Sequence, residues 1–253
     1  MRKAAVLLYG TICYAVFFAV FLYTIGFMGN FLVPKSIDSP TEGPLGIAIL
    51  INGGLLLLFG LQHSVMARPG FKQWLTRFIP EPIERSTYVM ATNVAMILLF
   101  WLWRPLGGNL WDVDNTAGQA ALYTLFGLGW LTILATTFLI NHFDLFGLRQ
   151  VWLYFRGKEY TSLSFVTPGP YKIIRHPLYV GWLMAFWATP TMSVAHLVFA
   201  LGMTAYILIA IVFEERDLID YHGERYAAYR RNTPMLLPRL FKSKTAAEES
   251  AST

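Results

Sequence analysis

Polar and ionisable side chains gather where long apolar stretches of the sequence begin or end. Histidine titrates near neutral pH and can relay a proton, carboxylates bind cations, and arginine binds carboxylates in a bidentate manner. Such residues stand at four points: Gln62 and His63; Asn141, His142 and Asp144; Arg175 and His176; and Glu214 and Glu215. These residue types supply the groups for proton transfer and for binding a charged ligand.

Each of these residues alone has a simpler explanation, because helix ends must satisfy polar backbone groups. His142 would then be a capping residue, and Asp144 would only form an ion pair with Arg149. Taken together, the residues favour a functional site, since ionisable groups within a membrane are costly and usually serve a function. For His196, inside an apolar stretch, and His222, in a polar segment, we expect structural roles.

The apolar stretches themselves indicate a membrane protein. The chain has 253 residues, of which 55% are hydrophobic and only 14% are charged. Tyr88 and Trp103 lie near the ends of one stretch, as is typical of an aromatic belt at the membrane interface. Cys13 is the only cysteine, so we expect no disulfide and no metal site. Five stretches lack Lys, Arg, Asp and Glu and are long enough for a spanning helix: 4–34, 43–67, 86–103, 115–143 and 176–213.

The distribution of basic residues predicts the topology. The net charge of +5 does not indicate nucleic-acid binding, because the basic residues fall in alternate connections between apolar stretches, and these connections mark the cytoplasmic side. Basic segments flank the stretch 176–213 on both sides, so it must cross an even number of times. We therefore predict a hairpin that turns near Pro190, with helices at roughly 178–190 and 192–213.

The predicted fold is an all-α integral membrane protein. Four spanning helices precede the C-terminal hairpin, which gives five to six membrane helices, and a cytoplasmic C-terminal helical segment follows with a break near Gly223. Both termini are predicted to be cytoplasmic. We divide the chain into spanning helices (1–150), the hairpin with the cytoplasmic helices (151–241), and a disordered tail (242–253).

Two segments near the C-terminus resemble a known superfamily. These are GPYKIIRHPLYVG at 169–181 and FEERDLIDYHGERYAAYRRNTPMLLP at 213–238. They resemble the isoprenylcysteine carboxyl methyltransferase and phospholipid methyltransferase superfamily, in which an R-H-P-x-Y-x-G motif, a glutamate pair and G-x-x-Y-x-x-Y follow in this order. Upstream, VPKSIDSP, LQHSVMARPGFK, PIERSTYV and INHFDLFGLRQVW resemble the bacterial methanethiol S-methyltransferases, so the second resemblance covers nearly the whole chain.

The superfamily resemblance implies that S-adenosylmethionine binds between the hairpin and the cytoplasmic helix that follows. Physical chemistry agrees, because a carboxylate of the glutamate pair suits the cationic sulfonium and amino group, and Arg175 suits the carboxylate of the cofactor. Pro177 fixes the backbone where a helix begins. The residues that the resemblance places around the cofactor are Tyr171, Arg175, His176, Pro177, Tyr179, Gly181, Glu214, Glu215, Tyr226 and Tyr229.

The second resemblance implies S-methylation of methanethiol to dimethyl sulfide, in the bacterial cytoplasmic (inner) membrane. Such a reaction needs alignment of the two sulfurs and removal of the thiol proton. His63, His142 and Asp144 are the candidates for accepting or relaying this proton, with Asn141 and Arg149 as orienting residues. The expected partners are therefore a small thiol and the lipid bilayer, and the sequence leaves the oligomeric state open.

Three other functions remain open from the sequence. A methyltransferase for a lipid or a prenylcysteine belongs to the same superfamily and would need a wide opening between helices. A nicotinamide-dependent membrane reductase has different chemistry in a distantly similar scaffold. A non-enzymatic membrane scaffold would also have basic loops and polar helix ends, but it gives no reason for the ordered R-H-P-x-Y motif and glutamate pair.

Overall fold

The computed structural model describes residues 2–40 and 43–239 and is predominantly helical, as predicted. Five helical segments are long and apolar enough to cross a membrane. They are α1 (Arg2–Gly29), α2 (Leu45–Ala67), the short 3₁₀ helix η1 (Glu81–Ile83) continued by α4 (Glu84–Leu102), α5 (Thr116–Ile140) and α9 (Val194–His222). A shorter apolar helix, α8 (Pro177–Trp187), is the first arm of the hairpin. The prediction of four spanning helices followed by a hairpin is therefore confirmed.

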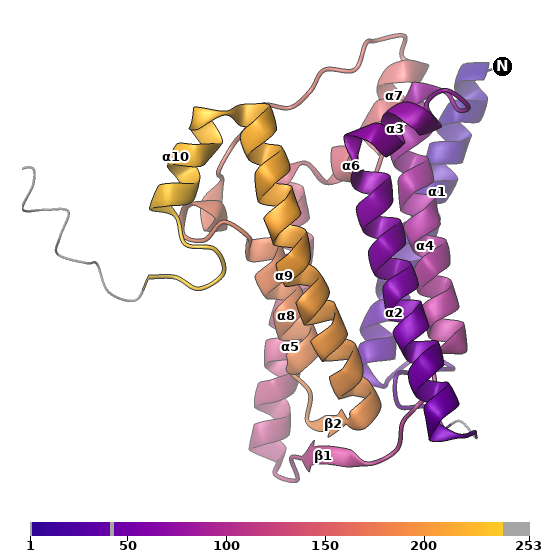
Figure 1. The fold of residues 1–253 in the computed structure, drawn as a ribbon, viewed down its shortest axis with the longest axis vertical. Helices are drawn as coiled ribbons and strands as arrows, with labels where there is room; N and C mark the ends of the chain where they lie inside the picture. The colour runs from indigo at the N-terminus through magenta and orange to yellow at the C-terminus, as the bar shows by residue number, and fades with distance from the viewer. Residues whose placement is uncertain (1, 41–42, 240–253) are drawn as a thin grey trace, which may run out of the picture.

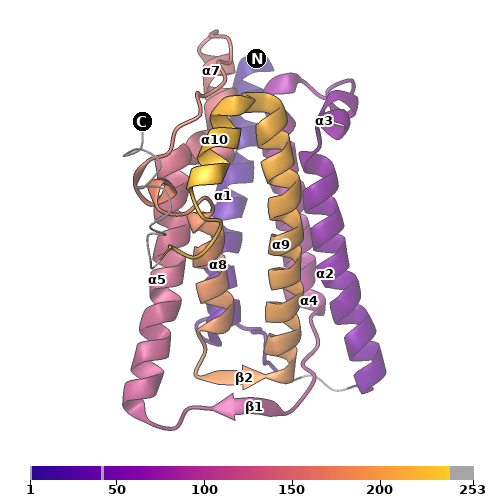
Figure 2. The same cartoon turned by 60° about the vertical axis from the view of Figure 1, so that its left-hand side comes forward.

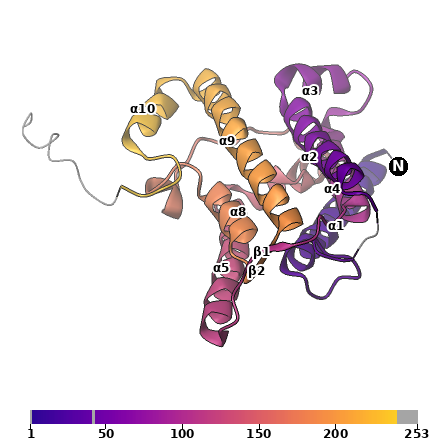
Figure 3. The same cartoon turned by 60° about the horizontal axis from the view of Figure 1, so that its bottom comes forward.

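The helices form an elongated bundle of two groups that lie side by side (Figures 1 and 2). α4 packs against both α1 and α2 in one group, and α5 packs along α8 in the other. α9 contacts both α8 and α2, so it joins the groups, and the view from the end of the bundle shows it between them (Figure 3). Residues far apart in the sequence can therefore meet where α9 faces α2.

The close contact between α5 and α8 depends on two glycines. A Cβ atom added at Gly129 would lie 2.9 Å from the carbonyl oxygen of Gly181, and one added at Gly181 would lie 2.9 Å from that of Gly129. Small residues at a helix interface let backbones approach closely in a membrane, where burial of apolar side chains gives little driving force. The pair therefore fixes α8 against α5, and the helix ends that carry polar residues stay in register.

The turn of the hairpin differs from the expected helix–turn–helix. α8 ends at Trp187 because Pro190 follows, and α9 begins only at Val194, where the Ser193 hydroxyl caps the His196 amide at 3.0 Å. Between them, β2 (Thr191–Ser193) pairs antiparallel with β1 (Asn109–Asp112), and no strand was predicted. Since β1 lies in the connection predicted to be outside, the hairpin reaches the side opposite the N-terminus (Figure 1).

The short helices lie at the other end, near the N-terminus (Figure 1). α9 continues beyond the predicted residue 213 to His222, and the predicted break occurs at Gly223, which has a φ of 59°. The predicted domain boundary at residue 150 lies within α7 (Leu148–Phe155), so the division of the chain at that point remains a prediction. The predicted tail 242–253 lies outside the described residues. The short elements are α3 (Pro69–Leu75), α6 (His142–Leu145), α7 (Leu148–Phe155), the 3₁₀ helix η2 (Gly169–Lys172) and α10 (Glu224–Asn232).

Candidate active site

The buried carboxylate of Glu215 organises the predicted cofactor region. Its Oε1 atom accepts hydrogen bonds from Arg175 Nε at 2.7 Å and from His176 Nε2 at 3.0 Å, and its Oε2 atom lies 2.8 Å from Arg230 Nε. Arg175 and His176 immediately precede α8, Glu215 lies on α9, and Arg230 lies on α10. One carboxylate thus connects three helices, and both of its oxygens are occupied by cationic or proton-donating groups.

The neighbouring Glu214 is different because it has no basic partner. Its Oε2 atom accepts a hydrogen bond from the Tyr179 hydroxyl at 2.7 Å, and among residues 2–40 and 43–239 no arginine, lysine or histidine forms an ion pair with it. Arg175 also donates from Nη1 to the carbonyl of Arg230 at 2.9 Å, which leaves Nη2 without a described acceptor. A negative charge and a guanidinium N–H thus remain available for a ligand.

Tyrosines surround this charged region. The Tyr229 hydroxyl donates to the backbone carbonyl of Tyr171, and the ring of Tyr226 is almost fully buried beside it. Phe165, from the connection before η2, packs against both tyrosine rings of α10. Burial raises the pKa of Tyr229 to about 12, so its hydroxyl stays protonated and acts as a donor at neutral pH.

Two other predicted cofactor residues have mainly structural surroundings. Pro177 is the first residue of α8 and is buried, with His176 in the N-cap position. Gly181 faces Gly129 and Ile133 of α5, within the contact that holds the two helices together. The structure therefore brings eight of the ten predicted residues together around the ends of α8 and α9 and on η2 and α10, while these two support the helix start and the helix packing.

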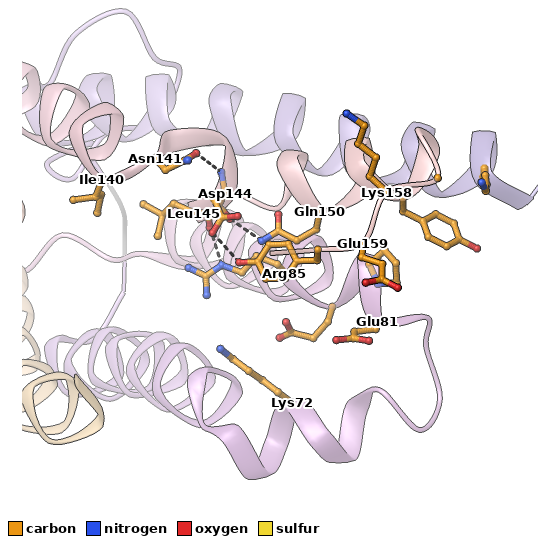
Figure 4. A pocket seen from close by; sticks show the side chains of 16 residues that line it. Lys72, Glu81, Arg85, Ile140, Asn141, Asp144, Leu145, Gln150, Lys158 and Glu159 are labelled. Atoms are coloured by element: carbon orange, nitrogen blue, oxygen red, sulfur yellow. Dashed lines mark hydrogen bonds between the residues drawn. The ribbon is translucent and has the colours of Figure 1, made fainter. Parts of the chain in front are cut away.

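Asn141, Asp144 and Arg149 form a separate polar group after α5. Asn141 adopts a left-handed conformation and its side chain accepts from the Asp144 amide, while the Asp144 carboxylate pairs with Arg149 at 2.9 Å. Asn141 and Asp144 line a cavity of about 850 Å³, together with Arg85 and Lys72 (Figure 4). None of the predicted cofactor residues lines this cavity, so the predicted site residues fall into more than one group.

His142 is buried behind this group, with hydrogen bonds to both ring nitrogens. Nδ1 lies 2.8 Å from the Thr137 hydroxyl, and Nε2 lies 2.8 Å from the Tyr14 hydroxyl. The Thr137 hydroxyl donates to the carbonyl of Leu134, so it accepts from Nδ1–H, and Nε2 accepts from Tyr14. Burial lowers the pKa of the His142 ring, which favours this neutral form.

His63 has a similar network at the end of α2. Its Nε2 atom lies 2.8 Å from the Tyr88 hydroxyl, and its Nδ1 atom lies 3.3 Å from the hydroxyl of Thr92. Its ring also lies 6.3 Å from that of Tyr206 on α9. The structure thus places His63 on the side of α2 that faces the hairpin.

The hydroxyl partners of both histidines were not predicted from the sequence. Tyr88 and Trp103 were expected in an aromatic belt, but they are 6% and 0% exposed, so both belong to the interior of the bundle. Tyr14 and Thr137 lie inside apolar stretches and carry no sequence signal. Tyr88 lies near the end of its apolar stretch, and this position fits a place at the membrane interface as well as a place in the interior. The hydroxyl of a tyrosine can contact water at an interface or bond to a buried partner.

Comparisons with known proteins agree with this architecture. Residues 121–225, which include all of α8 and α9, match the family model for phospholipid methyltransferases. No solved structure matches the chain.

Related proteins cover almost the whole chain. It is 57% identical over 238 residues to the methanethiol S-methyltransferase of Crocosphaera subtropica, covering 94% of this chain and 93% of that protein. It is 51% identical to the methanethiol S-methyltransferase of Mycobacterium tuberculosis, with 94% and 98% covered. A more distant relative is nurim of Bos taurus, 32% identical over 174 residues, which covers 65% of this chain and 66% of nurim. At these identities and coverages, the chain is a membrane methyltransferase and belongs to the methanethiol S-methyltransferase family.

Proposed function

We propose that this protein transfers a methyl group from S-adenosylmethionine to methanethiol and forms dimethyl sulfide and S-adenosylhomocysteine. The observation that carries the proposal is the Crocosphaera subtropica relative, which bears this substrate in its name and aligns over 94% of the chain. The alternatives with a lipid, a prenylcysteine or a nicotinamide have no comparable support among the relatives.

The charged region of the hairpin fits S-adenosylmethionine. Glu214 carries a negative charge that no described basic residue neutralises, and this suits a cationic sulfonium or ammonium. Arg175 has an N–H group available for a carboxylate, and the partly exposed ring of Tyr229 on α10 offers a flat apolar surface. Glu215 has a positioning role, because it holds Arg175 and His176 in place.

When bound, the cofactor supplies an electrophilic methyl group on a positively charged sulfur. The sulfur of the thiol forms the new S–C bond while the S–C bond of the donor breaks, and the thiol proton must leave to a base. We propose His63 and His142 as proton acceptors, and the position of His63 beside Tyr206 of the hairpin favours His63. Asn141, Asp144 and Arg149 would order the connection after α5, next to the cytoplasmic cavity.

The reaction can be tested with purified protein in lipid nanodiscs. Methanethiol and S-adenosylmethionine should give dimethyl sulfide in the headspace and equal amounts of S-adenosylhomocysteine. The Glu214→Gln variant should bind the cofactor more weakly in calorimetry, whereas Glu224→Gln, which alters an exposed ion pair with Arg231, should bind it normally. Folded, cofactor-binding protein that yields no dimethyl sulfide would exclude methanethiol as the substrate.

We further propose that the protein lies in the bacterial inner membrane with both termini in the cytoplasm. The basic residues support this, since Arg2 and Lys3 lie in the first turn of α1 and several arginines follow the spanning part of α9. Reporter fusions at the two ends should both report a cytoplasmic location. A periplasmic signal from either end would contradict this topology.

A further inference from the structure

Both nitrogens of the His63 ring are engaged, so a substrate thiol cannot reach them directly. The Thr92 hydroxyl donates to the backbone carbonyl of Tyr88 at 3.1 Å and therefore accepts from Nδ1–H of His63. With Nδ1 protonated, the Nε2 lone pair accepts the hydroxyl proton of Tyr88 at 2.8 Å. A proton can thus reach His63 only through the oxygen of Tyr88.

The Tyr88 oxygen is the open end of this network. Tyr88 is 6% exposed, and its hydroxyl donates its one hydrogen bond to His63. Among the residues that the structure describes, none donates a hydrogen bond back to this oxygen, so it keeps its acceptor capacity. A buried acceptor that has no donor is well suited to the S–H group of a small thiol.

Charges near Tyr88 connect it with the proposed cofactor region. The Arg85 guanidinium lies 4.9 Å from the centre of the Tyr88 ring, one turn earlier on the same helix, and can stabilise negative charge that develops on the oxygen. On the other side, Tyr88 bonds to His63, whose ring lies 6.3 Å from that of Tyr206 on the hairpin helix α9. Tyr88 therefore lies between a cation and the hairpin that carries the residues proposed to hold the methyl donor.

We propose that Tyr88 is a catalytic residue that takes the proton of the thiol, an inference that rests on the proposed S-methylation. The S–H bond of the thiol breaks and an O–H bond forms on Tyr88, while the former hydroxyl proton of Tyr88 forms an N–H bond at Nε2 of His63. The thiolate electron pair then forms the new S–C bond. The released proton remains on His63 until it passes to water.

The test compares Tyr88→Phe with wild type on thiols of different acidity. With methanethiol, the variant should turn over about 100-fold more slowly, a typical loss for general base catalysis, with its affinity for S-adenosylmethionine within about twofold. With the more acidic trifluoroethanethiol, the ratio of wild-type to variant rate should shrink, because this thiol ionises without help. The matched control is Tyr9→Phe, which deletes a hydroxyl bonded to Thr87, the neighbour of Tyr88, and should retain the wild-type rate.

Each result decides the proposal. A Tyr88→Phe rate close to wild type, or a loss of equal size with both thiols, would overturn it, because a purely structural role does not depend on thiol acidity. If Tyr88→Phe no longer binds the cofactor, Thr92→Val is decisive: it removes the acceptor for Nδ1–H and should slow methanethiol more than the acidic thiol. Wild-type protein that forms no dimethyl sulfide would instead refute the proposed substrate, so the two failures are distinguishable.

Discussion

His63 and His142 are held by the same three-part network in two different parts of the bundle. In each case a tyrosine hydroxyl donates to Nε2 at 2.8 Å, and Nδ1–H donates to a threonine hydroxyl that itself donates to a backbone carbonyl. Both rings are thus oriented as neutral acceptors toward a tyrosine. Hydrogen bonding alone therefore does not distinguish a catalytic histidine from a structural one.

The surroundings of the two networks differ. The His142 ring stacks on Phe138 with 4.2 Å between centroids, and Phe146 and Phe143 cover it further. The His63 ring also stacks on a phenylalanine, Phe59, but its network lies in addition beside Arg85 and beside Tyr206 of the hairpin. The positive charge of Arg85 can stabilise negative charge that develops on the Tyr88 oxygen, whereas an apolar enclosure mainly stabilises a neutral ring. The comparison suggests that the hairpin makes the His63 network functional.

The largest expected effect comes from Glu215→Gln, which disrupts the hairpin side. Arg175 and Arg230 would lose a buried counter-charge, so the free energy of unfolding should fall by about 3–5 kcal/mol and cofactor binding should be lost. Thermal unfolding in detergent and calorimetry would measure both. Glu224→Gln, in an exposed pair with Arg231, should cost at most about 1 kcal/mol. Equal losses in the two variants would show that the buried cluster is not the organising element.

The next largest effect separates the two histidines. His63→Gln should lower turnover about 100-fold with little change in cofactor affinity, because it removes the final proton acceptor. His142→Gln should have a smaller effect on turnover and should mainly lower stability. Initial rates beside calorimetry would measure both quantities. A larger rate loss in His142→Gln would reverse the assignment and make the enclosed network the catalytic one.

The sequence predicted those features that depend on local charge and composition. The basic residues in alternate loops required an even number of membrane crossings in the last apolar stretch, and so predicted the hairpin. The motif around Arg175 and His176 predicted the region that Glu215 organises. Strand β2 was missed because three residues are too few for a pattern, and its pairing with β1 depends on a distant segment. The partner of His63 was missed because hydrogen bonding between α2 and α4 depends on how each helix is rotated, which an almost uniformly apolar sequence does not indicate.

The contact between α5 and α8 links the two regions, because α5 ends just before His142 and α8 begins just after His176. Gly181→Ala would place a Cβ atom 2.9 Å from the carbonyl of Gly129, so we expect a loss of about 1–3 kcal/mol in the free energy of unfolding. Gly127→Ala on α5 meets open space and is the matched control. Unfolding midpoints of the two variants would measure the difference. If both variants unfold like wild type, the backbone contact is not tight enough to couple the regions.

The smallest effect is a dependence of stability on pH at His142. Burial lowers the pKa of His142 in the folded protein below its ordinary value of about 6.5, so the unfolded chain binds more protons just below that pH. The contribution is fully present above about pH 6.5 and is lost as the pH falls, with a slope of at most about 1.4 kcal/mol per pH unit. Unfolding midpoints between about pH 5 and pH 8 should therefore fall on the acid side in wild type and fall less in His142→Gln. If the unfolding midpoints of both proteins fell equally on the acid side, the aromatic enclosure would not hold His142 neutral. Only the turnover rates of the two histidine variants would then distinguish His142 from His63.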